Sequence, residues 1–391
     1  MRLLPLLKES VLNETHAWPF KLSPAITKSA TIGDLFSKFR GDNTISLELV
    51  FGPSDRELIL RYTFRSFERD TAVLMSFSAF DSANQIDVEL DLSQVNSSER
   101  LRSGENKYVD KGAAIDFSRL RFNGVLPYFD LEVGKENSNL LHFFEKQRTA
   151  LRTLENVYWL GPLRKSIGRI ERFIPATNYI GPNGEGASQI LFDDSLLGGP
   201  IFREVSEWFE KNCNVSLDVV RSAHEFGALA SLALVRGGDV AVRVPLEDAG
   251  EGMSQVLPVL TYAAMAAHGR LGYDPLIMIE HPDLHLHSNA HFAVVEYLVR
   301  CAQSEYRPRF VIESHSEAVL TSTQLMLIDS KLRPSDFIAY HVVSEIGGSA
   351  KANAVELQEN GESINGKFGT FDWFTIANRK AVELARKKIA G

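Results

Sequence analysis

The sequence is poor in cysteine and has no long run of apolar residues. It contains two cysteines, Cys213 and Cys301, and neither belongs to a CxxC pair. This argues against a disulfide framework and a cysteine-ligated zinc site, and it is typical of a reducing compartment. No stretch approaches the roughly 18 apolar residues of a membrane span. Because Lys8 and Glu9 also interrupt the first apolar run too early for a secretion signal, we predict a cytoplasmic protein without membrane contact.

The chain also lacks an excess of positive charge. Its 42 Lys and Arg residues are outnumbered by 50 Asp and Glu residues, which leaves a net charge of −8. This balance excludes a strong overall attraction to nucleic acid, although it allows a local basic patch. With 391 residues, 44% of them hydrophobic, the chain has enough material for two or three domain-sized units.

Two kinds of sequence pattern divide the chain near residue 157. From about residue 44 to 92, apolar and polar residues alternate between turn-forming residues, which predicts an antiparallel meander. In the last 150 or so residues, short continuous apolar runs alternate with helix-length segments, a pattern typical of a parallel sheet covered by helices. We therefore predict an α/β fold: residues 1–157 form an N-terminal helix, an antiparallel β-subdomain and a helical arm, and residues 158–391 form an α/β core.

Individual elements are expected from the same periodicities. Helices are predicted over residues 1–12, 138–157, 200–212, 254–268, 288–304 and 316–328. Strands are predicted over residues 45–51, 57–64, 73–77, 86–92, 215–221, 227–236, 239–244, 275–279, 310–312 and 337–343. Residues 93–136 are polar and expected to be irregular, and Trp208 and Phe209 are expected to fill core.

The segment most informative about chemistry is an apolar strand that ends in acids. The run Leu276–Ile279 is followed by Glu280, His281, Pro282 and Asp283. A carboxylate at the C-terminal end of a buried parallel strand faces the crevice where ligands bind. There it can hold Mg²⁺, usually through water, beside nucleotide phosphates.

A second apolar strand ends in a histidine about 30 residues later. Phe310–Ile312 leads into Glu313, Ser314 and His315. Neighbouring strands of a sheet lie about 5 Å apart. His315 is therefore predicted to reach the same crevice as Glu280 and to contact a γ-phosphate.

A glycine-rich helix start lies about 30 residues before Glu280. Here Gly250, Gly252 and Ser254 open a helix. Backbone amides at a helix N-terminus suit a phosphate. Taken alone, this segment is better explained as a glycine turn with a Ser cap.

Together the three elements resemble the signature, Walker B and switch-His motifs of ABC-type ATPases. Their residues resemble those of a bacterial family of RecF/OLD-like AAA ATPases. The matching segments are Asp248–Leu260, Ile279–His287, Ile312–Glu317, Tyr158–Arg164 and Gly181–Gly186, and the resemblance covers about residues 30–390. It implies an ABC-type ATPase head that uses ATP and Mg²⁺.

The resemblance also implies roles for single residues of the site. Glu280 falls at the magnesium-directed acid, and Asp283 takes the place of the second acid. His281 stands where the general-base Glu usually stands, and a His there can orient a water. His315 matches the switch His. Arg164 is included as a supporting residue, although a solvated surface charge is the simpler interpretation of Arg164 and Lys165.

The signature turn implies a partner. Gly250, Gly252, Ser254 and Gln255 match this turn, which in this class meets the nucleotide bound by a partner head. The resemblance therefore implies a head-to-head dimer, either a homodimer or an assembly with a partner ATPase or nuclease subunit. A role in DNA transactions or phage defence follows from family analogy alone.

One motif of the family is missing. The family begins with a strand, a GxxxxGK[S/T] loop and a helix, but no such loop occurs here, and the Gly181–Gly186 turn lacks the Lys-Ser/Thr pair that should follow. Without this loop, the β- and γ-phosphates lose most of their contacts. Residues 1–12 resemble the end of the helix after the loop, so we expect the P-loop strand and helix to be missing and the chain to begin about 40–50 residues late.

Three origins of this missing segment are open. It was lost from the gene, it was left out of this polypeptide, or a separate chain supplies it. In each case we expect weak or no ATP hydrolysis by the isolated chain.

Two rival interpretations also stay open. His281, Asp283, His285, His287 and His291 lie within eleven residues. This density of imidazole and carboxylate suits zinc or another transition metal in a metal-dependent hydrolase. The other rival is a non-catalytic scaffold or regulatory pseudo-ATPase, which the absent loop favours over an active ATPase.

Overall fold

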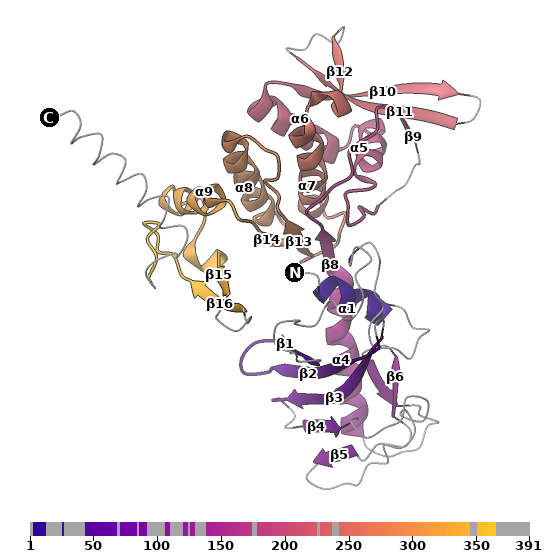
Figure 1. Ribbon diagram of the computed structural model, residues 1–391, viewed down its shortest axis with the longest axis vertical. Helices are drawn as coiled ribbons and strands as arrows, with labels where there is room; N and C mark the ends of the chain where they lie inside the picture. Colours follow the sequence, from indigo (N-terminus) through magenta and orange to yellow (C-terminus); the bar gives the residue numbers. More distant parts are fainter. Residues whose placement is uncertain are drawn as a thin grey trace, which may run out of the picture. The chain divides into compact units, whose positions relative to one another are not determined.

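The computed structural model of the chain contains two compact units, Met1–Trp159 and Leu160–Gly391, and each is described by itself (Figure 1). The structure describes residues 3–12, 26, 44–68, 71–83, 86–91, 106–109, 120–123, 126–129, 138–173, 178–224, 227–236, 242–344 and 350–364. Within these ranges, no helix combines the length and the hydropathy that a membrane crossing requires.

The first unit is built on a five-stranded antiparallel sheet in the order β1-β2-β3-β4-β5. The strands are Thr44–Phe51, Leu58–Glu68, Thr71–Asp81, Ile86–Asp91 and Asn106–Val109. Tyr62, Phe64 and Phe77 are at most 1% exposed, and the ring of Tyr62 lies 5.0 Å from that of Phe77. The antiparallel meander predicted from alternation is confirmed because alternate residues of these strands form a buried aromatic face.

Helices and a short hairpin complete the first unit. They are α1 (Leu3–Leu12), β6 (Leu120–Asn123), β7 (Leu126–Phe129), α4 (Ser138–Arg152) and the 3₁₀ turn η2 (Thr153–Asn156). An ion pair of 2.7 Å links Lys146 of α4 to the fully buried Asp81 at the end of β3. The expectation of an irregular segment over 93–136 was wrong for β5, β6 and β7, whose four-residue length is too short to show a period.

The second unit begins with helices packed beneath an antiparallel sheet (Figure 1). The sheet has the order β10-β11-β12, and β9 also pairs with β11. Its strands are Glu171–Arg172, Ser216–His224, Gly227–Val235 and Arg243–Pro245 for β9 to β12. The helices are α5 (Ala187–Leu196), α6 (Pro200–Cys213) and α7 (Glu251–Ala267), with the 3₁₀ turn η3 (Leu246–Ala249) before α7.

Helix α7 is the buried centre of this unit. Every residue from Ser254 to Ala266 is buried, because α7 packs against α5, α6 and α8. Trp208 and Phe209 of α6 are 6% and 0% exposed, which confirms that they fill core. A helix that is apolar on all sides is expected at the core of a large unit.

A parallel strand pair lies next along the chain. Strands β13 (Leu276–Glu280) and β14 (Arg309–Glu313) pair in parallel within a three-stranded sheet of order β14-β13-β8, where β8 is Val157–Leu160. Helix α8 (Ser288–Ala302) connects β13 to β14, as a parallel crossover requires, and α9 (Glu317–Ile328) packs against α8. The α/β class, with an antiparallel sheet and a parallel pair flanked by helices, is confirmed.

Three sequence expectations in this unit were wrong. Residues 337–343 were expected to add a buried parallel strand, but β15 (Ala339–Ser344) forms an antiparallel hairpin with β16 (Ala350–Val355). Tyr340 and Val342 on it are 58% and 63% exposed, so these two apolar side chains lie outside the core. Strand β14 was expected to be fully buried, yet Val311 is 38% exposed because β14 is an edge strand.

Other element boundaries also differ from the prediction. Helix α5 was not predicted. Of the predicted strand 239–244, residues 239–241 lie outside the described residues, and β12 begins at Arg243.

The burial of α7 generates a stability prediction. Leu260 of α7 is 0% exposed and Leu197, after α5, is 78% exposed. We expect Leu260→Ala to lower the free energy of unfolding by about 2–5 kcal/mol, because it leaves a cavity in packed surroundings. The matched control Leu197→Ala is expected to change it by less than about 0.5 kcal/mol. Urea unfolding followed by tryptophan fluorescence measures both, and equal effects would contradict the assigned core.

Candidate functional site

The predicted acid and histidine lie at neighbouring strand ends. In the parallel register, Glu280 of β13 is the partner of Glu313 of β14. The chain leaves both strands at the same edge, where the backbone N–H of His281 donates to the carbonyl of Glu313 at 2.7 Å. The rings of His281 and His315 then lie 5.1 Å apart with a tilt of 39°. The expected adjacency of the two strand ends is therefore present, and the rings of His281 and His315 approach each other there.

The loop after β13 is folded into an unusual backbone conformation. His281 and His285 have φ values of 48° and 61°, a left-handed conformation that few non-glycine residues adopt. The hydroxyl of Ser314 donates to the carboxylate of Asp283 at 3.0 Å, which ties this loop to the turn after β14. The two loops therefore support each other, and Asp283 acts as their link.

Arg164 is buried beneath this edge. It is 5% exposed, and its guanidinium donates to the backbone carbonyls of Glu280 at 2.6 Å, His281 at 3.1 Å and Gln255 at 3.2 Å. The interpretation of Arg164 as a solvated surface charge was wrong, because its side chain turns inward to these carbonyls. Lys165, in contrast, is exposed.

The buried charge of Arg164 is balanced by nearby acids. Burial lowers the pKa of Arg164 to about 10, while the carboxylates of Asp283 and Glu280 act in the opposite direction. The guanidinium therefore stays charged at neutral pH. Gln255 holds the backbone of Arg164 from both sides, since its Oε1 accepts from the Arg164 N–H at 3.2 Å and its Nε2 donates to the Arg164 carbonyl at 2.8 Å.

The glycine-rich start of α7 lies against the same loop. A Cβ on Gly252 would come within 2.5 Å of the carbonyl oxygen of His285, so only glycine fits there. Gly250 has φ 98° and caps the helix. Ser254 and Gln255 are each 3% exposed, and the Ser254 hydroxyl lies 3.5 Å from the carbonyl of Leu246. In this conformation, the side chains of both residues face their own chain.

The proposed histidine cluster is not assembled in the way that the sequence suggested. His285 lies 3.6 Å from Glu251, and His291 contacts the hydroxyl of Ser316 and the carbonyl of Leu286, each at 3.1 Å. Because the loop turns at two left-handed residues, these rings diverge. Among the described residues, the metal-competent group is instead His281, Glu313 and His315, with ligand atoms within 4.8 Å of one another. Sequence reasoning missed Glu313 as a site residue, although it directly precedes the Ser-His pair.

The Gly181–Gly186 turn has a packing role. A Cβ on Gly184 would lie 2.7 Å from the ring of Pro258 in α7, and the Pro182 carbonyl accepts from the Gly161 N–H at 2.7 Å. Ala187 stands where a phosphate loop has its lysine. The turn therefore supports the 161–165 segment that carries Arg164.

Another glycine pattern was overlooked. Gly361, Gly366 and Lys367 have the spacing GxxxxGK, but Phe368 follows where Ser or Thr is required. A Cβ on Gly361 would lie 3.2 Å from Ile328 at the end of α9, and residues from 365 onward lie outside the described residues. The strand–loop–helix context of a phosphate loop is not observed in the described part.

The residues at the strand ends fit a magnesium ion. Mg²⁺ takes oxygen ligands, usually one or two carboxylates and water. Glu280 is 5% exposed and Asp283 is half-buried. Both lie close enough to Arg164 to counteract the lowering of its pKa by burial. These two carboxylates would hold the ion.

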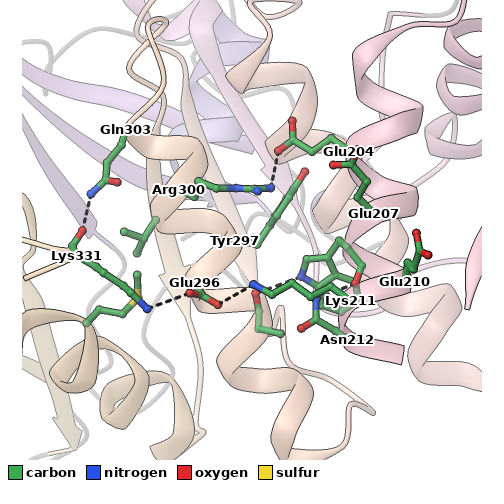
Figure 2. A pocket seen from close by; sticks show the side chains of 14 residues that line it. Glu204, Glu207, Glu210, Lys211, Asn212, Glu296, Tyr297, Arg300, Gln303 and Lys331 are labelled. Atoms are coloured by element: carbon green, nitrogen blue, oxygen red, sulfur yellow. Dashed lines mark hydrogen bonds and ion pairs between the residues drawn. The ribbon is translucent and has the colours of Figure 1, made fainter. Parts of the chain in front are cut away.

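A separate cleft of about 520 Å³ lies between α6, α8 and the end of α9 (Figure 2). Glu296 is approached there by Lys331 at 3.3 Å and by Lys211 at 3.7 Å. None of the site residues predicted from the sequence lines this cleft. The chemistry-bearing groups therefore gather at the strand ends and not in this hollow.

Arg164 generates a prediction for the site. Arg164→Met would leave three carbonyls without their donor and two acids without their counter-charge, so we expect it to lower the free energy of unfolding by about 3–5 kcal/mol. Arg164→Lys keeps the charge but not the planar fork of donors. We therefore expect it to lower the free energy of unfolding by an intermediate amount. Lys165→Met, one residue away and exposed, is the control. Thermal unfolding of the three variants measures these changes in stability. An Arg164→Met protein as stable as the wild type would show that the buried hydrogen bonds of Arg164 contribute little to stability.

Comparison with known protein families identifies one whose model matches this sequence. The family model described as "AAA domain, putative AbiEii toxin, Type IV TA system" matches residues 13–321. No curated protein matches the chain.

Several solved structures are similar to the chain. An Smc head bound to the C-winged helix domain of ScpA has a TM-score of 0.40 and 11% identity, over 90% of this chain and 86% of that one. An Smc head with an extended coiled coil from Pyrococcus furiosus, bound to the C-terminal domain of ScpA, has a TM-score of 0.38 and 10% identity, over 91% of this chain and 87% of that one. The SMC head from Thermotoga maritima has a TM-score of 0.31 and 9% identity, over 79% of this chain and 76% of that one.

The family model spans residues 13–321 of the 391, which is well over half of the chain. The protein therefore belongs to this AAA family of ATPases.

Proposed function

We propose that the chain is an ABC-type ATPase head whose nucleotide site is formed at the C-terminal ends of β13 and β14. The observation that carries this proposal is the parallel register of Glu280 and Glu313, which brings His281 and His315 together at one edge. Ligands of open parallel sheets bind at this edge. Membership of the AAA family supports a nucleoside triphosphate as the substrate.

Each residue of the edge has a proposed task. Glu280 and Asp283 hold Mg²⁺ through water, and the ion neutralises charge on the phosphate oxygens. His315 is exposed and contacts the γ-phosphate, while half-buried His281 orients the attacking water. Arg164 touches no substrate in this scheme. It is a positioning residue that fixes the carbonyls of Glu280 and His281.

The remaining phosphate contacts are proposed to come from outside these residues. The 391 residues contain no GxxxxGK[S/T] loop, and such a loop supplies the lysine and the amide cradle for the β- and γ-phosphates. We therefore propose that another polypeptide segment completes the site and that the chain by itself hydrolyses ATP weakly or not at all.

A second head is the proposed partner. Gly250 and Glu251 are exposed at the N-terminus of α7, where backbone amides face outward. These amides, and not the buried side chains of Ser254 and Gln255, are the groups that a nucleotide held by a partner head would meet. The partner is a second copy or a related ATPase or nuclease subunit. A role in DNA transactions or phage defence rests on family analogy.

The proposal predicts Mg²⁺-dependent nucleotide binding that requires the strand ends. We expect Glu280→Gln and His315→Ala each to weaken binding of a fluorescent ATP analogue at least about tenfold, equivalent to ~1.4 kcal/mol. His268→Ala removes a histidine that contacts Glu204 at 2.6 Å and serves as the control with unchanged binding. Fluorescence anisotropy measures the affinities, and thermal unfolding checks that each variant is folded.

Two outcomes would contradict this function. The first is binding to the wild-type chain that is equally tight with and without Mg²⁺. The second is unchanged binding in both site variants. Either result would favour a non-catalytic scaffold.

A further inference from the structure

We propose that His281, Glu313 and His315 form a binding site for a transition-metal ion of the zinc type. Their imidazole nitrogens and carboxylate oxygen all lie within 4.8 Å of one another. The three residues come from the ends of two paired strands, so the parallel register itself brings the ligands together. This site is distinct in composition from the oxygen-only magnesium site proposed for Glu280 and Asp283.

The donor set selects the kind of metal. Zinc binds histidine nitrogen and carboxylate oxygen, and sites with two His and one Glu leave a fourth position open for water. Magnesium prefers oxygen ligands only, so two imidazoles disfavour it. The two cysteines are not required, since Cys301 is buried and Cys213 half-buried elsewhere on α8 and α6.

The geometry requires only a small closure. Zinc bonds of roughly 2.0–2.2 Å place tetrahedral ligand atoms about 3.3–3.6 Å apart. Atoms that lie within 4.8 Å of one another therefore need to approach by at most about 1.5 Å. His315 is exposed, so a change of its side-chain rotamer can supply this movement. His281 and Glu313 are half-buried and offer a fixed base for it.

The backbone around the ligands is held in place. The His281 N–H donates to the Glu313 carbonyl at 2.7 Å, which joins two of the ligands directly. Next to His315, the Ser316 N–H donates to the Ser314 hydroxyl at 3.0 Å, and that hydroxyl donates to Asp283. Supporting hydrogen bonds of this kind orient metal ligands and raise affinity.

The charge of the edge favours a cation. The carboxylates of Glu280, Asp283 and Glu313 lie on the two strand ends and the loop between them, and Arg164 is the cation that contacts this edge. Three acids against one guanidinium leave a negative surplus. A divalent ion at His281, Glu313 and His315 offsets this surplus.

The inference goes beyond the proposed ATPase function. It shares His281 and His315 with that function, but metal binding needs neither nucleotide nor a partner chain. Its failure leaves the nucleotide experiment untouched, and failure of nucleotide binding leaves the metal site untouched.

The test is a zinc titration of the chelator-treated full chain by calorimetry, without nucleotide. One Zn²⁺ per chain is expected, with Mg²⁺ at least tenfold weaker. His281→Ala, Glu313→Gln and His315→Ala are each expected to weaken Zn²⁺ binding at least tenfold. The matched control His285→Ala keeps the wild-type affinity.

A second measurement covers variants that fail to fold. Co²⁺ bound to the wild-type chain is expected to show the visible absorption of a site with nitrogen and oxygen ligands, without a thiolate charge-transfer band. Three results would overturn the proposal: no bound zinc, a thiolate band, or a loss of affinity in His285→Ala as large as in His281→Ala.

Discussion

The buried guanidinium of Arg164 is the interaction on which the site depends. It joins three segments that are far apart in the sequence: its own loop after β8, the backbone of α7 at Gln255 and the end of β13 at Glu280 and His281. The planar fork of a guanidinium, with five donors, reaches carbonyls on two different segments, a geometry that the compact ammonium of a lysine does not offer. Removing it from water is costly, and the acids Glu280 and Asp283 compensate that cost. The same charges that would hold a metal ion therefore also hold the scaffold together.

The arrangement of the edge follows from how β13 and β14 pair. Parallel strands present their C-terminal ends on the same side, so acids and histidines that are about 30 residues apart converge. The edge carries two kinds of ligand. Carboxylates suit magnesium and phosphate chemistry, and imidazoles suit a transition metal. His281 has a proposed role in both sites, and its ring lies 5.1 Å from that of His315.

Part of this arrangement could be predicted from the sequence. The alternation in β1 to β4 and the apolar run before Glu280 follow from simple periodicity, and the spacing of Glu280 and His315 indicated neighbouring strand ends. The burial of Arg164 could not be predicted, because a charged residue after a glycine turn is usually solvated. Its partners are backbone carbonyls, which no residue pattern encodes. Glu313 was missed since its role depends on the register with Glu280.

Other differences have equally local causes. Strand β15 is apolar at Tyr340 and Val342 yet exposed, and periodicity reports only that a strand has an apolar face, not what covers it. The glycines at 250 and 252 were expected to serve a phosphate. The structure adds a steric reason for Gly252, since a Cβ there would meet the carbonyl of His285.

The most direct test of the account is a crystal structure of the chain grown with Mg²⁺ and a non-hydrolysable ATP analogue. The account predicts phosphate density at the ends of β13 and β14, in contact with His315 and with an ion beside Glu280. Phosphate bound in the cleft between α6 and α8 while the strand ends stay empty would contradict it.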